Sequence, residues 1–132
     1  MRTAIHSALW KDDFVIGDSL LDYEHQMIVG LIENCVRLVR NGEAKAQVVE
    51  ILRITESYLA YHFHGEESSM EDDGDNRFDI HRQQHRHLLA ILKERIFCLE
   101  NGHPSLTAQQ VAFELYDWYV AHLMQEDIKL MQ

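Results

Sequence analysis

The apolar positions of the chain recur at spacings of three and four residues over four long segments. This spacing places apolar side chains on one face of an α-helix, and no segment shows the period of two that a strand requires. We therefore expect helices over about residues 19–40, 44–72, 77–100 and 107–131. The residues expected on the inner face of a helix form its predicted inner stripe. For the second helix this stripe is Val48, Ile51, Thr55, Tyr58, His62, Glu66 and Ser69. For the fourth helix it is Val111, Leu115, Trp118 and His122.

Three short interruptions separate the predicted helices. They read Asn41-Gly42, Asp72-Asp73-Gly74-Asp75 and Asn101-Gly102-His103-Pro104. Glycine and proline in such positions stop helices, and Thr107 with Gln110 has the spacing of a capping box that starts the next one. Short connections between long helices favour antiparallel neighbours. The expected fold is an all-α, up-down-up-down four-helix bundle, one domain over residues 1–132 with an extended N-terminal arm at 1–18.

Charge and composition argue against several classes of partner. The 132 residues include 22 acidic and 12 basic side chains, a formal charge of −10 with histidine neutral. Such a surface repels nucleic acids and anionic membranes, and no apolar run approaches the roughly 20 residues that span a bilayer. The first dozen residues do not resemble a signal peptide. Cys35 and Cys98 lie in apolar helical patterns, so we expect buried free thiols and a cytoplasmic location. We also expect a monomer.

Histidine is the residue type that stands out, with nine in the chain. Five histidines and one glutamate interrupt the predicted inner stripes: His25, His62, Glu66, His81, His85 and His122. Residues four apart share a face of a helix, and helix directions alternate. All six therefore fall within about 6–15 Å of the same end of the bundle, from the rise per residue of an α-helix.

This convergence favours a metal site over ordinary core packing. A single histidine on an inner face is more often a hydrogen-bonded core residue than a ligand. Burying six polar groups at one level without partners would cost several kcal/mol for each group. A metal ion removes this cost because it accepts lone pairs from imidazole and carboxylate groups.

The fourth helix leaves the choice of one further ligand open. Glu126 is four residues after His122 and shares its face, whereas Asp127 lies about 140° away in a regular helix. However, Glu126 lies among residues of a solvated face, and Asp127 and Met131 continue the inner stripe after one skipped residue. A π-bulge near His122 would insert such a skip. Spacing alone does not choose between the two carboxylates.

Four motifs, in order and spanning nearly the whole chain, resemble those of the bacteriohemerythrins. The motifs are Trp10 before Val15-Ile16-Gly17 and Asp22-Tyr23-Glu24-His25-Gln26; His62-Phe63-His64-Gly65-Glu66-Glu67-Ser68-Ser69-Met70; His81-Arg82-Gln83-Gln84-His85; and Trp118-Tyr119-Val120-Ala121-His122-Leu123-Met124-Gln125-Glu126-Asp127. One HxxxH motif alone would be weak evidence, but all four in this order are specific.

The resemblance implies a non-haem centre of two iron ions that binds O2 reversibly. It implies two sets of ligands, His81, His85 and His122 for one iron and His25 and His62 for the other. Glu66 and Asp127 would bridge the irons together with an oxo or hydroxo group from solvent, so the resemblance favours Asp127 over Glu126. An octahedral count then leaves one open position, on the iron with two histidines, for O2 or a competing small anion such as azide.

The side chains next to these ligands are candidates for the O2 pocket, although ordinary core packing explains them equally well. They are Ile28, Phe63, Trp118, Tyr119 and Leu123. Tyr119 departs from the leucine of the family's motif. Its hydroxyl could reach the open position, or it could point to the rim and hydrogen-bond to solvent.

Other polar residues near the motifs are not expected to bind metal. His64 and His87 each lie two residues from a ligand and so face away from it. Asp22 could accept a hydrogen bond from a ligand imidazole, or it could be a surface or capping residue. Glu67 is expected to face solvent.

The expected function is O2 storage, transport or scavenging by a carrier that is not an enzyme. The chain ends five residues after Asp127, which favours a stand-alone carrier over the input domain of a larger sensor. Three alternatives remain open. One is a di-iron enzyme that reduces O2, peroxide or nitric oxide, and another is an O2 or redox sensor acting through a partner. The third is an interaction module that the metal only stabilises, without O2 chemistry.

Overall fold

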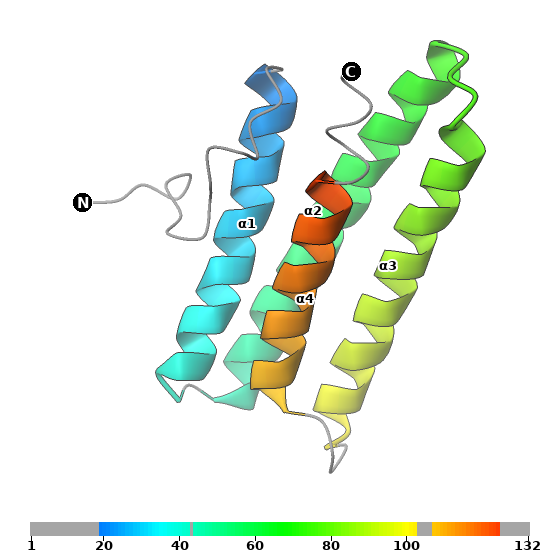
Figure 1. Cartoon of the computed structure of the whole chain (residues 1–132). Helices are drawn as coiled ribbons and strands as arrows, with labels where there is room; N and C mark the ends of the chain where they lie inside the picture. The colour runs from blue at the N-terminus through cyan, green and yellow to red at the C-terminus, as the bar shows by residue number, and fades with distance from the viewer. Residues whose placement is uncertain (1–18, 43, 103–106, 125–132) are drawn as a thin grey trace.

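The computed structural model is a bundle of four helices, shown in Figure 1. It describes residues 19–42, 44–102 and 107–124. The helices are α1 (Ser19–Arg40), α2 (Lys45–Asp72), α3 (Phe78–Glu100) and α4 (Ala108–His122). Successive helices run in opposite directions, and α1 and α3 each pack against both α2 and α4. The prediction of an all-α, up-down-up-down bundle is confirmed.

The helix boundaries agree with the sequence-based prediction to within one residue wherever both are described. Helix α1 matches it, and the next three helices each begin one residue later than expected. The fourth was expected to reach Met131, but the described part of the chain stops at Met124. The predicted N-terminal arm at 1–18 also lies outside the described residues.

The three interruptions end helices as their residues predict. In the first, Gly42 has a φ of 69°, in the left-handed region that glycine adopts without a steric penalty. Its N–H donates to the carbonyl of Val39 at 3.1 Å. This bond satisfies a carbonyl at the end of α1 that has no partner within the helix and turns the chain toward α2.

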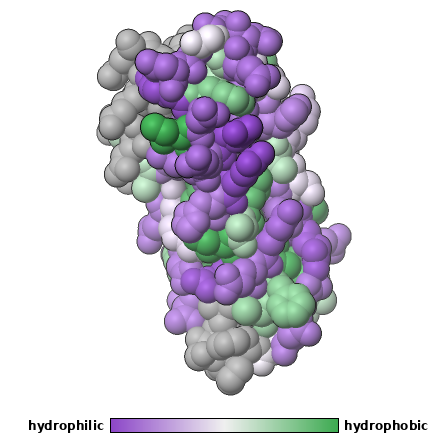
Figure 2. All heavy atoms as spheres, turned by 90° about the vertical axis from the view of Figure 1, so that its right-hand side faces the viewer, coloured by the Kyte–Doolittle hydropathy of each residue, from purple (hydrophilic) through white to green (hydrophobic). Residues whose placement is uncertain are grey.

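The apolar faces of the helices meet in one core, while hydrophilic side chains predominate on the face shown in Figure 2. Four members of the predicted α2 stripe are buried as expected, namely Val48, Thr55, His62 and Glu66. The other three are displaced by one residue, and Met70 is buried in place of the exposed Ser69. Leu52 and Leu59 are 0% and 3% exposed, whereas Ile51 and Tyr58 are only partly buried. Among the described helices, none has the length and apolar character needed to cross a membrane.

The two cysteines differ in burial. Cys35 is fully buried in α1, and burial raises the pKa of its thiol to about 12 because the thiolate would lose its hydration. Cys98 is only partly buried, which corrects the expectation that both thiols lie in the core. Both are free thiols.

The capping box at the start of α4 leads to a first prediction. The hydroxyl of Thr107 accepts a hydrogen bond from the Gln110 N–H at 3.1 Å, and the Thr107 N–H donates to Gln110 Oε1 at 2.9 Å. Replacing Thr107 by alanine should lower the free energy of unfolding by about 1 kcal/mol in urea denaturation. Thr107→Ser keeps the hydroxyl and should retain most of this stability; an equal loss in both variants would contradict the role of the cap.

Candidate metal centre

Five histidines and one glutamate from all four helices meet inside one end of the bundle. Helix α1 begins at this end, α2 ends there, α3 begins there after the short turn, and α4 ends there. These side chains are between 0% and 7% exposed. The residues are His25, His62, Glu66, His81, His85 and His122. The structure thus brings together six of the seven residues that the sequence analysis singled out as ligands.

Their ligand atoms form two groups that share Glu66. Within each group, the imidazole nitrogens and carboxylate oxygens lie within 4.8 Å of one another. One group consists of Glu66, His81, His85 and His122, and the other of His25, His62 and Glu66. These are distances at which one ion could contact every member of a group.

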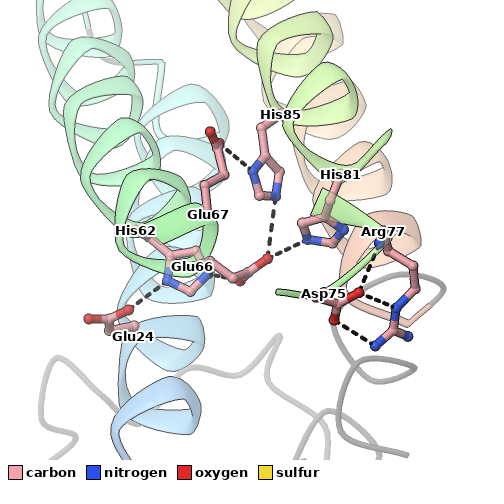
Figure 3. A network of polar contacts seen from close by, with 8 residues as sticks. All are labelled: Glu24, His62, Glu66, Glu67, Asp75, Arg77, His81 and His85. Carbon is pink, nitrogen blue, oxygen red and sulfur yellow. Dashed lines mark hydrogen bonds and ion pairs between the residues drawn. The ribbon is translucent and has the colours of Figure 1, made fainter. Parts of the chain in front are cut away.

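The carboxylate of Glu66 lies between imidazoles of α2 and α3, as Figure 3 shows. Its Oε1 is 2.5 Å from His81 Nε2 and 3.4 Å from His85 Nε2. Its Oε2 is 3.1 Å from His62 Nε2. One oxygen therefore faces each group, which is the arrangement that a carboxylate shared by two ions requires.

Aromatic packing restricts the imidazoles of the larger group. The ring centroids of His81, His85 and His122 lie 4.4–5.3 Å apart in pairs. Phe63 stacks on His85 with centroids 3.8 Å apart and planes within 5°. The same phenyl ring lies edge-on to His122, at 5.4 Å between centroids. Phe63 is thus a wall of the site that limits ring rotation.

Two carboxylates that the sequence analysis did not identify contact ligand imidazoles from outside the cluster. His62 Nδ1 donates to Glu24 Oε1 at 2.6 Å, and His85 Nδ1 donates to Glu67 Oε2 at 2.8 Å, as Figure 3 shows. The expectation that Glu67 faces solvent is therefore wrong. Both carboxylates adjoin a ligand in sequence, so they lie about 100° around the helix and face the neighbouring helix. A carboxylate directly beside a predicted ligand was therefore the feature of the sequence that could have identified these two contacts.

The donor set fits a metal ion. A carboxylate has no proton to donate near neutral pH, so Nδ1 carries the proton in both imidazole–carboxylate pairs. In the neutral imidazoles, Nε2 of His62 and of His85 then presents a lone pair to an oxygen of Glu66, and a cation between these atoms, a metal ion or a proton, removes the repulsion. Imidazole and carboxylate are ligands of divalent transition metals, iron among them. The cluster is compatible with two ions that share Glu66.

Comparison with known proteins agrees with this geometry. The family model described as "Hemerythrin HHE cation binding domain" matches residues 17–132. The chain belongs to the hemerythrin family. Bacteriohemerythrins of Pseudomonas paraeruginosa and Pseudomonas aeruginosa are each 25% identical to it over 119 residues, which cover 90% of this chain and 76% of theirs. The bacteriohemerythrin of Stenotrophomonas maltophilia is 24% identical over the same length.

In this hemerythrin domain, the residues directly after α4 form the kind of turn considered for Asp127. Regular α-helix ends at His122, and a π-helical turn follows at Leu123 and Met124. Such a turn accommodates one additional residue, so a side chain five positions after His122 can share its face. Glu126 and Asp127 lie outside the described residues, and the choice between them stays a prediction.

Four of the five candidate pocket residues are buried in the core around the cluster. The four are Ile28, Phe63, Tyr119 and Leu123, each at most 2% exposed. Trp118 is only partly buried, which corrects the predicted inner stripe of α4. The stripe passes instead through Tyr119, one residue later, because spacings of three and four residues both fit a helix face.

The side chain of Tyr119 extends into the interior of the bundle. It is 2% exposed, and its ring centroid lies 6.4 Å from that of His25. The alternative that Tyr119 points to the rim and hydrogen-bonds to solvent is therefore wrong. The phenol lies on the side of the smaller ligand group.

Proposed function

We propose that this protein binds O2 reversibly at a non-haem di-iron centre, for storage, transport or scavenging. The main support is the pair of ligand groups that share Glu66, in a chain whose relatives include bacteriohemerythrins. In the proposal, His81, His85 and His122 hold one iron and His25 and His62 the other, with Glu66 and Asp127 as bridges. When bound, the two irons supply a redox-active centre with an open position for O2.

The residues around the cluster support a carrier over an enzyme. Together with two bridging carboxylates, the five imidazoles would occupy most of the coordination positions of two octahedral ions and leave few for reacting species. Ile28, Phe63 and Leu123 are buried and present apolar surface to the interior of the bundle. Apolar surroundings exclude water and protons, which would otherwise convert the oxygenated form to an oxidised one.

Optical spectroscopy with an iron count tests the proposal. The protein is reduced without air, its iron content is measured, and O2 is then added and removed. We expect two irons per chain, a colourless reduced form and a persistent coloured form that disappears when O2 is removed. Direct conversion to an oxidised spectrum would instead indicate a di-iron enzyme that reduces O2, peroxide or nitric oxide. Absence of bound iron would refute the site itself.

Removal of the buried phenol tests its contribution to O2 binding. Tyr119→Phe keeps the ring and removes one hydrogen-bond donor, so oxygenated protein should oxidise about two- to tenfold faster, the effect of losing one ordinary hydrogen bond. The decay of the visible band in air measures this rate. Tyr116→Phe, at a partly buried position one turn earlier on α4, is the matched control. Equal rates in the wild type and Tyr119→Phe would exclude a contact between the hydroxyl and bound O2.

The proposed setting is a monomer in the cytoplasm, with O2 as its ligand and small anions such as azide as competitors. The two free thiols support a reducing compartment, because an oxidising one favours disulfides. A concentration-independent mass in sedimentation and bleaching of the oxygenated band by azide are the expected observations. A sensor acting through a partner would require a second protein that binds one oxygenation state more tightly than the other.

A further inference from the structure

Each of the two ligand groups contains one imidazole held by a carboxylate from a neighbouring helix. Glu24 reaches from α1 to His62 on α2, and Glu67 reaches from α2 to His85 on α3. The nitrogen–oxygen distances, 2.6 and 2.8 Å, are those of hydrogen bonds to a charged acceptor. Both pairs therefore span helix interfaces and fix the position of one ring relative to the next helix.

Burial within each pair separates the roles of its two members. The side chains of His62 and His85 are 0% and 1% exposed, whereas those of Glu24 and Glu67 are 16% and 20% exposed. The carboxylates thus lie at the boundary between the core and solvent, where water can still solvate a negative charge. The imidazoles have their Nε2 atoms inside, toward Glu66.

We propose that Glu24 and Glu67 are positioning residues of the metal centre. Each keeps its imidazole in the tautomer with the proton on Nδ1, aims Nε2 at the ion and makes that nitrogen more basic. The inference rests on the metal centre of the proposed function but does not require that the centre bind O2. It assigns roles to two residues that the sequence motifs leave outside the ligand set.

The two residues should differ in importance, for two structural reasons. His62 is one of two imidazoles in its group, whereas His85 is one of three. His85 also stacks on Phe63 at 3.8 Å, while the rings of His62 and Phe63 are 5.8 Å apart and tilted by 50°. His62 is also contacted edge-on by His25, at 4.8 Å between centroids, so both rings have a further support, and the face-to-face stacking on His85 is the closer one. The hydrogen bond from His62 to Glu24 is the more critical of the two.

A titration of metal-free protein with Co2+ in the absence of O2 tests this inference. Glu24→Ala should weaken one of the two binding steps by about 10–100-fold, the usual effect of removing such a partner, and Glu67→Ala should weaken binding by less. The controls are Glu33→Ala on α1 and Glu56→Ala on α2. These glutamates have side chains 18% and 17% exposed, close to those of Glu24 and Glu67, and lie near Arg37 and Lys93.

The outcomes separate positioning from a general structural role. The proposal would be overturned if Glu24→Ala and Glu67→Ala bound Co2+ with wild-type affinity at both steps. It would also be overturned if the two control variants lost as much Co2+ affinity as these variants do. Glu24→Gln retains an acceptor oxygen without the charge and should bind Co2+ with an affinity between those of the wild type and Glu24→Ala. A chain that binds two Co2+ ions as described but no O2 after iron loading would contradict the proposed function alone.

A second measurement covers the case in which an alanine variant fails to fold. In wild-type protein loaded with Zn2+, nitrogen NMR of labelled histidine reports which ring nitrogen carries the proton. We expect the proton on Nδ1 of both His62 and His85. A proton on Nε2 of either residue would overturn the proposal whatever the variants do.

Discussion

A Glu66→Ala variant should bind no more than one iron per chain, the largest effect expected of any single substitution. The Glu66 carboxylate belongs to both ligand groups and lies within 3.4 Å of nitrogens from His62, His81 and His85. The substitution removes one ligand from each of the two ligand groups. It thereby removes the carboxylate that both cations would share. Metal analysis after anaerobic reconstitution with Fe2+ measures the stoichiometry, and addition of O2 should produce no persistent visible band.

The control for this variant is Glu71→Ala, because Glu71 is an exposed carboxylate on the same helix. It should bind two irons, as the wild type does. Circular dichroism of the metal-free proteins checks that both variants remain helical. Two tightly bound irons in Glu66→Ala would contradict its role as a shared ligand, and the imidazoles alone would then have to account for the centre.

An Asp127→Ala variant should also lose the two-iron form, whereas Glu126→Ala should retain it. The reason is the π-helical turn at Leu123 and Met124, because a turn of this kind can accommodate one additional residue after His122. With that additional residue, the fifth position after a histidine would take the place that the fourth has in a regular helix. Iron content and the visible spectrum after exposure to O2 measure the effect.

These two variants form a matched pair, since they remove adjacent carboxylates from the same segment. Two irons in Asp127→Ala together with their loss in Glu126→Ala would reverse the assignment. The α-helix would then continue in regular register through this ligand, and the resemblance to the family's last motif would be wrong at that position.

Most of the fold could be predicted because its signals are local. A spacing of three and four residues defines a helix without reference to any other segment. The Asn-Gly and Pro signals that end helices act within a few residues of their own position, as Gly42 illustrates. For this reason the predicted and described boundaries of α1, α2 and α3, and the start of α4, differ by at most one residue.

Six of the seven candidate ligands could be predicted and located because they interrupt apolar stripes. A buried polar side chain at a stripe position is unfavourable without a partner, so several of them at one level indicate that they bind a common ligand. The alternation of helix directions then places the six at one end. The pairs of Glu24 with His62 and Glu67 with His85 could not be predicted in the same way, because a contact between helices depends on how far each helix is rotated.

The sequence by itself determined the all-α class, the order of the helices, the ends of the first three, and the depth at which the histidines lie. Only the tertiary structure decided that Leu52 and Tyr119 are buried in the core, whereas Ile51 and Trp118 are only partly buried. It also decided that the two oxygens of Glu66 divide between the ligand groups. The physical reason is that periodicity specifies the face of a helix to within about one residue, or about 100° of rotation. Packing against neighbouring helices is required to remove that uncertainty.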